Sequence, residues 1–168
     1  GHGIFELTKQ NGACFVWKLD PSGNLLWAKA SVGSTPFGGN AIARDREGNL
    51  YTIGTALLNA EYGTDPKAFE MATVTSSHVT FISKPDANGN FVWAKAQDST
   101  YMIEEPHDIV VDDAGYVHTT GIFGETMDFD PSPEVFALKA TGELGTYVST
   151  LDKDGNFVRA FEFGEGYG

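Results

Sequence analysis

KLDPSGNLLWAKA, residues 18–30, recurs as KPDANGNFVWAKA at 84–96 and as TLDKDGNFVRAFE at 150–162. Each copy begins 66 residues after the one before it, with the same residue types at the same places. Equal spacing with matched side chains is the signature of a tandem structural repeat.

A second motif alternates with the first. AIARDREGNLYTIG at 41–54 matches DIVVDDAGYVHTTG at 108–121, 67 residues later. Both motifs predict β-hairpins, because large and small side chains alternate with the two-residue period of a strand around a turn. The turns share the pattern Asp-x-x-Gly, in which Asp caps backbone N–H groups and Gly supplies a positive φ. The five turns begin at Asp20, Asp45, Asp86, Asp112 and Asp152.

Two hairpins in each repeat make four strands, which we expect near 41–46, 49–56, 78–85 and 89–97, and again near 107–112, 115–123, 145–151 and 155–163. We name the strand positions of one repeat A to D. Tandem four-stranded units predict an all-β fold, a partial β-propeller of about two and a half antiparallel blades with a period of about 66 residues. The half blade, an outer hairpin, falls in 1–40, and full blades fall in 41–106 and 107–168. The connections between strands B and C, 57–77 and 124–144, are expected to project from one rim.

Two and a half blades cannot close a ring, which needs about 4–8. The missing neighbours are further blades of the same longer chain, copies of this chain, or another protein. The net charge of −12 makes nucleic acid and anionic lipid unsuitable partners, and no apolar run suits insertion into a membrane. The single cysteine, Cys14, is expected to be a small buried hydrophobe rather than a reactive thiol.

Several of these stretches resemble the bacterial seven-bladed β-propeller repeats called SBBP. The matching strings are FVWKLDPSGNLLWAK at 15–29, GNAIA at 39–43 and TGIFGETMDFDP at 120–131. The chain departs from the pattern at 57–71, where residues 60–66 match the Asp-Phe-Asp-Pro loop only loosely, and at Arg159, where the other copies have Trp. The resemblance implies a secreted or bacterial cell-surface protein and carries over no catalytic residue.

Asp128, Asp130 and Glu134 form the candidate ion site, because clustered carboxylate oxygens suit Ca²⁺. A proline-fixed turn whose carboxylates cap backbone N–H groups explains the same residues, and we favour it. A second candidate lies where the innermost strand of the last blade opens at the channel mouth. There His107 and Asp108 follow Glu104 and Glu105, a set suited to a ligand, a metal or acid–base chemistry. Solvated loop charges are the simpler interpretation.

Trp27 and Trp93 occupy the same repeat position, where aromatic side chains are expected to fill the space between blades; a sugar-stacking platform is the alternative. We find no order of Ser, His and Asp, phosphate loop or zinc spacing in the sequence. We therefore expect a non-catalytic extracellular module for protein–protein interaction or for surface and filament scaffolding. The alternatives are a module that binds Ca²⁺ or glycan, and a fragment of a propeller hydrolase or lyase. We expect no cofactor, apart from the calcium alternative.

Overall fold

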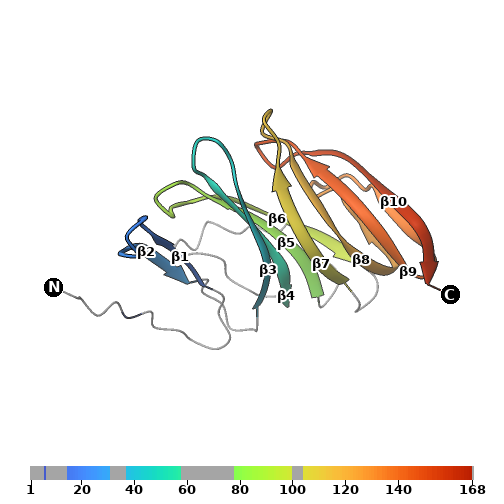
Figure 1. Cartoon of the computed structure of the whole chain (residues 1–168). Helices are drawn as coiled ribbons and strands as arrows, with labels where there is room; N and C mark the ends of the chain where they lie inside the picture. The colour runs from blue at the N-terminus through green and yellow to red at the C-terminus, as the bar shows by residue number, and fades with distance from the viewer. Residues whose placement is uncertain (1–5, 7–14, 31–36, 58–77, 100–103, 168) are drawn as a thin grey trace.

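The computed structural model describes residue 6 and residues 15–30, 37–57, 78–99 and 104–167 (Figure 1). Within these ranges every regular element is a β-strand, and no helix there is long and apolar enough to cross a membrane. The predictions for Cys14 and for 58–77 fall outside the described residues. The strands are β1 (Phe15–Leu19), β2 (Leu25–Ala30), β3 (Phe37–Arg44), β4 (Leu50–Leu57), β5 (His78–Pro85), β6 (Phe91–Ser99), β7 (Glu104–Val111), β8 (Val117–Asp128), β9 (Ala137–Leu151) and β10 (Phe157–Tyr167).

The strands form three successive antiparallel units that follow one another across the molecule from the N- to the C-terminal end (Figure 1). We call β1–β2 the first hairpin, β3–β6 blade I and β7–β10 blade II. In each blade, every strand pairs with the next one along the chain. β6 and β8 join the two blades into one eight-stranded sheet, but among the described residues they do so only through the pairs Asp98 with Asp128 and Ser99 with Met127, so each blade is otherwise a separate four-stranded unit. The all-β, partial propeller-like fold is thereby confirmed.

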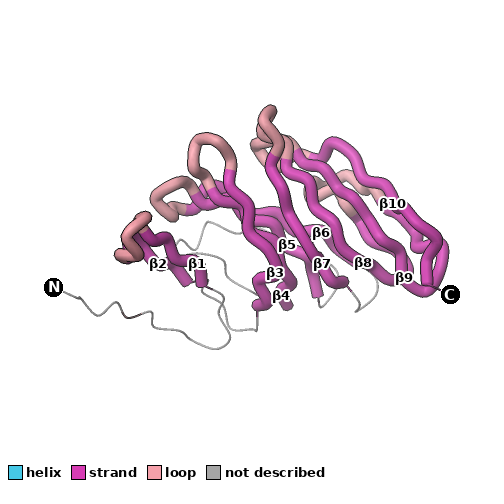
Figure 2. Tube along the Cα trace, in the orientation of Figure 1, coloured by secondary structure: helices cyan, strands magenta, loops and turns pink. Residues whose placement is uncertain are grey.

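The hairpin turns form as the sequence predicts, and they gather along one edge of the molecule, drawn in pink in Figure 2. In the β5–β6 turn, Asp86 Oδ1 accepts hydrogen bonds of 2.8 Å from the backbone N–H groups of Asn88 and Asn90. These hydrogen bonds, with one from the Asn90 side chain, lower the pKa of Asp86. Gly89 closes the turn at a φ of 78°, which is unfavourable for a residue with a Cβ. Local chemistry therefore fixes where each hairpin reverses.

The 124–144 segment is where the structure corrects the sequence-based prediction. Instead of a long projecting connection, β8 and β9 continue as a paired hairpin as far as Asp128 and Ala137. Two contacts of Phe129 hold the tip in place. Its backbone N–H donates to the Phe136 carbonyl, and its ring is fully buried. A shift in pairing between Gly124 and Thr126 marks a bulge inside the hairpin.

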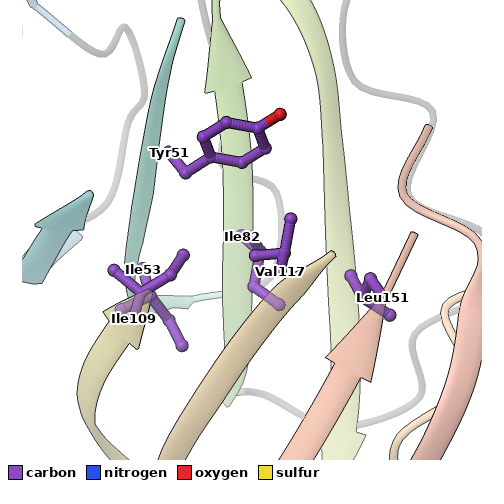
Figure 3. Close-up of a cluster of buried hydrophobic side chains, with 6 residues drawn as sticks. All are labelled: Tyr51, Ile53, Ile82, Ile109, Val117 and Leu151. Carbon is purple, nitrogen blue, oxygen red and sulfur yellow. The ribbon is translucent and has the colours of Figure 1, made fainter. Parts of the chain in front are cut away.

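The main hydrophobic core lies between the blades, not inside one of them (Figure 3). Tyr51, Ile53 and Ile82 of blade I meet residues of blade II that are also at most 2% exposed. A second cluster, around Phe123, Phe129 and Tyr147, fills blade II beneath the extended hairpin. Since burial of apolar area drives folding, the first cluster makes the stability of each blade depend on the blade beside it. The partners from blade II in the first cluster are Ile109, Val117 and Leu151.

Candidate functional site

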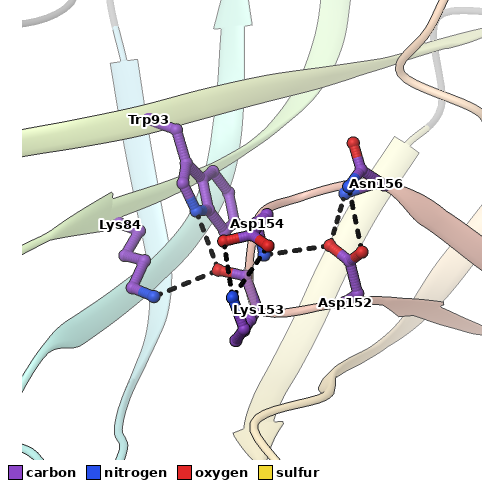
Figure 4. Close-up of polar contacts among 6 residues, drawn as sticks. All are labelled: Lys84, Trp93, Asp152, Lys153, Asp154 and Asn156. Carbon is purple, nitrogen blue, oxygen red and sulfur yellow. Dashed lines mark hydrogen bonds and ion pairs between the residues drawn. The ribbon is translucent and has the colours of Figure 1, made fainter.

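A polar contact joins blade I to blade II at the turn between β9 and β10 (Figure 4). Lys84 on β5 donates from Nζ to the backbone carbonyl of Lys153 at 3.0 Å. Trp93 on β6 donates from Nε1 to the same carbonyl at 3.2 Å. We call a Lys, a Trp and the turn carbonyl that they share a turn latch. One oxygen with two lone pairs accepts both bonds.

The same latch occurs one repeat earlier. Lys18 and Trp27 of the first hairpin donate to the carbonyl of Ala87 in the β5–β6 turn, at 2.8 and 3.3 Å. The Trp ring also covers the turn glycine, because a Cβ built on Gly89 would lie 3.0 Å from Trp27. Two junctions built from equivalent residues show that the latch belongs to the repeat.

Tyr51 on β4 supports the latch of blade I. Its ring lies edge-on to Trp93 with centroids 6.0 Å apart, and Lys84 Nζ stands 5.0 Å from the ring centroid, a cation–π contact. The Tyr51 hydroxyl donates to Asp45 Oδ2 at 3.3 Å, which ties the ring to the β3–β4 turn. Burial and the Asp45 charge raise the pKa of Tyr51, so the phenol stays neutral.

The third copy replaces every latch side chain. Thr150, Arg159 and His118 stand at the positions of Lys84, Trp93 and Tyr51. His118 shares a 3.1 Å hydrogen bond between Nδ1 and Thr150 Oγ1, and its Nε2 lies 3.2 Å from Asp112 Oδ2. This Thr–His–Asp order has the connectivity of a nucleophile relay, but Thr150 is only 2% exposed, so a substrate has no approach to its hydroxyl. We therefore interpret the trio as a structural network.

The sequence prediction placed Trp27 and Trp93 between blades but did not identify the latch. The missing information is long-range: each Trp binds a carbonyl 60 residues away and each Lys one 69 residues away. A signal was nevertheless present, because Lys and Trp are both retained in the first two copies and both lost in the third. Loss of both residues together is expected when they share one acceptor.

The four residues predicted at the channel mouth do not converge. β7 begins at Glu104, three residues earlier than expected, so neighbouring side chains point to opposite faces. Glu105 and His107 face solvent, with Glu105 Oε2 and His107 Nε2 3.9 Å apart, and Asp108 Oδ1 accepts from the Ile109 N–H. Only the side chain of Glu104 enters the space between the blades, where it is 7% exposed.

Glu104 is an ionisable side chain buried between the two blades. Both carboxyl oxygens are buried and make no hydrogen bond of good geometry with the described residues, although Ser99 and Thr80 lie near enough to favour the charged form in part. Burial, together with the nearby charge of Asp98, raises the pKa of Glu104 to about 8. The group is therefore mostly protonated at neutral pH, which avoids the cost of an unpaired buried charge.

The predicted calcium residues form a turn. Asp128 Oδ1 accepts hydrogen bonds from the backbone N–H groups of Asp130 and Phe136 at 3.0 and 2.9 Å. Asp130 Oδ1 accepts from Ser132 N–H at 2.8 Å, and Glu134 is exposed. In the described ranges no three His, Cys, Asp or Glu residues are placed to hold a metal ion. The geometry supports the capping interpretation, and calcium binding stays a prediction.

A pocket of about 400 Å³ lies between the first hairpin and blade I, lined mostly by apolar residues. Phe15 and Trp17 of β1 form one wall, and Ile42 of β3 and Phe81 of β5 contribute to the other. Phe15 and Trp17 are 60% and 61% exposed, which is unusual for rings this large. The pocket was not predicted from the sequence.

Comparison with known proteins gives a distant similarity. The chain is 28% identical over 152 residues to a protein of Acanthamoeba polyphaga mimivirus named as an uncharacterized WD repeat-containing protein, L264. The match covers 87% of this chain but only 11% of that protein. No family model matches the chain. The similarity agrees with a propeller-type repeat, and the resemblance to SBBP repeats stays a prediction.

Proposed function

We propose that this chain is a non-catalytic β-propeller repeat module that holds proteins together, either by binding partners or by building a surface or filament scaffold. The observation that carries the proposal is the turn latch. It recurs at both described junctions with the same donors and the same acceptor position. A joint that repeats with fixed geometry stacks blades into a rigid platform, as in other repeat proteins.

Apolar residues left uncovered at the ends of the stack support a role in assembly. Besides Phe15 and Trp17 at the first hairpin, Phe161 and Phe163 of β10 are 45% and 49% exposed. Large exposed apolar side chains near a polar rim are typical of surfaces that bind another protein. The name of the viral relative, a WD repeat-containing protein, is consistent with such a role.

The proposal includes a secreted or bacterial cell-surface location and the division into a half blade and two blades. The net charge of −12 suits a protein that stays soluble in a salty medium. It also disfavours nucleic acid as a partner.

Native mass measurement of the purified chain tests the proposal. We expect particles heavier than the 18.1 kDa single chain, because each exposed end lacks the neighbour that covers the equivalent residues inside the stack. An 18.1 kDa monomer with one sharp, cooperative melting transition would contradict it. The matched comparison is Phe161→Ser, which we expect to weaken association without unfolding the blades.

A further inference from the structure

Six buried side-chain oxygens make no hydrogen bond of good geometry with the described residues, and all six lie where the two blades face each other. The side chains that carry them are at most 7% exposed. A buried polar atom without a partner is costly, so six in one region need a physical explanation. We call the five residues the polar layer: Thr80 and Gln97 of blade I, and Glu104, Thr119 and Tyr147 of blade II.

The polar layer continues the apolar core along the same strands. Thr80 lies two residues from Ile82 on β5, so the two side chains point to the same face. Thr119 lies two residues from Val117 on β8 and shares its face in the same way. Both steps lead away from the hairpin turns. The joint between the blades is therefore apolar near the turns and polar further from them.

The contacts of Gln97 across the joint show which of its atoms is left over. Its Nε2 donates to the Phe129 carbonyl and to Ser149 Oγ, both at 3.1 Å. The Phe129 carbonyl can only accept, so it fixes the orientation of the amide, and the two bonds use both amide hydrogens. Gln97 Oε1 therefore points away from both partners, as an acceptor that no other described residue uses.

The members of the polar layer are linked from one blade to the other. On blade I, Thr80 is the register partner of Gln97. Gln97 reaches blade II at Ser149, whose register partner is Thr119. Thr80 also lies near enough to Glu104 to favour its charged form in part. The polar layer is therefore continuous from Glu104 to Thr119.

The length of the polar layer indicates what can occupy it. Glu104 pairs with Phe123, which is four residues from Thr119 on β8, or about 13 Å along a strand. A metal ion binds oxygen ligands at about 2.0–2.6 Å, so one ion cannot contact both ends. A buried water makes about three hydrogen bonds, as donor and as acceptor, so about two waters satisfy six oxygens. Hydroxyl groups, which three members of the layer carry, suit water because they too donate and accept.

We propose that the polar layer binds enclosed water molecules, which carry the hydrogen bonds from blade I to blade II where the apolar core ends. The joint is then dry near the turns, where the core and the latch hold it, and hydrated further along. This inference goes beyond the proposed function and does not depend on it, because a chain that stays monomeric holds the same waters between its own blades.

Removal of single hydroxyl groups gives opposite signs for a hydrated and a dry layer. Thr80→Val and Tyr147→Phe each delete one oxygen of the layer with little change in shape. In a hydrated layer each change removes hydrogen bonds to water, so we expect the melting temperature to fall by about 2–4 °C. In a dry layer the same change removes a costly unpaired atom. An unchanged or higher melting temperature in both variants would therefore overturn the proposal.

Oxygen-17 relaxation dispersion of the solvent detects the waters themselves, because it reports water molecules that stay bound for longer than the protein takes to tumble. We expect the amplitude of the wild-type chain to decrease in the double variant Thr80→Val, Thr119→Val. Thr120→Val is the matched control, because Thr120 Oγ1 already donates to the Tyr147 carbonyl at 2.7 Å, and its amplitude should equal that of wild type. Equal amplitudes in the wild-type chain and the double variant would contradict a water site.

A comparison of salts distinguishes water from a cation as the ligand. Melting temperatures of the wild-type chain are measured in sodium, potassium and choline chloride at one ionic strength, and we expect the three to agree. A higher melting temperature in sodium or potassium chloride, abolished by Glu104→Gln, would show that the layer binds a cation instead and would overturn the assigned ligand.

Discussion

Single residues fix the joints of this molecule, and the turn latch shows how. A backbone carbonyl in a turn would otherwise bond to water, yet Lys153 O receives an ammonium and an indole N–H from the preceding blade. The indole also contributes apolar area over Gly155, whose added Cβ would lie 3.2 Å from the Trp93 ring. Packing and hydrogen bonding therefore act through the same side chain.

Trp93→Ala is expected to lower the free energy of unfolding by about 2–3 kcal/mol, since it removes ring contacts and one hydrogen bond at a partly exposed site. Trp93→Phe keeps most of the packing and loses the N–H donor, so we expect a loss of about 1 kcal/mol. Urea unfolding followed by circular dichroism measures both. Equal effects for Ala and Phe would show that packing contributes nothing to the joint.

Glu104 predicts a pH dependence with a definite sign. Its folded pKa of about 8 lies above the ordinary value of 4.5, so between these pH values the folded chain keeps a proton that the unfolded chain has lost. Stability therefore falls as pH rises from about 4.5 to 8. Asp98 and Tyr147 are the other titratable groups that sense this site.

We expect Glu104→Gln to be more stable than wild type at pH 8, by about 1–3 kcal/mol, and similar to it near pH 4.5. Urea midpoints across this pH range measure the difference. Glu105→Gln is the matched control, because the neighbouring carboxylate faces solvent. A constant offset at every pH would contradict titration of Glu104 as the cause.

At the scale of the element, the sequence predicted the hairpins well because their determinants are local. The Asp-x-x-Gly turns and alternating side chains located eight strands and one further hairpin, and the expected 78–85 coincides with β5. It failed for 124–144, where Pro131, Pro133 and scattered polar residues obscure the alternation of β8 and β9. That hairpin is stabilised by distant contacts, including Gln97 Nε2 donating to the Phe129 carbonyl at 3.1 Å. The geometry of the candidate ligand set at the channel mouth also depends on where β7 starts, because the start of the strand decides which carboxylate turns inward; binding of a ligand or of calcium stays a prediction.

Gly121→Ala tests the close approach of strands within blade II. An added Cβ would lie 2.8 Å from Pro106 Cα on β7 and 3.0 Å from the Tyr147 ring on β9, so neither neighbour can yield easily. We expect a loss of about 2–4 kcal/mol, measured by urea unfolding. Gly38→Ala, whose nearest contact would be Thr55 Oγ1 at 3.3 Å, should remain near wild type.

Mutation at the tip of the β8–β9 hairpin distinguishes two roles for its carboxylates, capping of backbone N–H groups and calcium binding. Asp128→Ala removes the acceptor of two backbone N–H groups, and we expect it to lower stability by about 1–2 kcal/mol. Calcium at millimolar concentration should leave the melting temperature of the wild-type chain unchanged. A rise in melting temperature that Asp128→Ala abolishes would instead support the calcium site.

For the whole molecule, the repeat order implies that stability is graded along the chain. The first hairpin is a two-stranded sheet, which is marginal alone, and the latch from Lys18 and Trp27 ties it to blade I. The two blades share a continuous buried core. Local opening should therefore begin at the first hairpin.

Hydrogen exchange of the Trp27→Ala variant tests whether stability increases from the first hairpin to the two blades. We expect the amides of 15–30 to exchange about tenfold faster, while those of β3 to β10 keep their wild-type rates, because the core between the blades is untouched. Trp93→Ala, the equivalent change one repeat later, should instead reduce protection in both blades. Uniform acceleration by Trp27→Ala would show that the hairpin and the blades open as one unit.

The acceptor of each latch is a main-chain oxygen, and this leaves the residue that carries it free to vary. Alanine serves at position 87 and lysine at position 153, although their side chains have nothing in common. Successive turns can therefore diverge in charge, size and chemistry while the joints beneath them stay the same. The turns along the rim can therefore acquire new side chains, and with them new binding specificities, while the joints between the blades are unchanged.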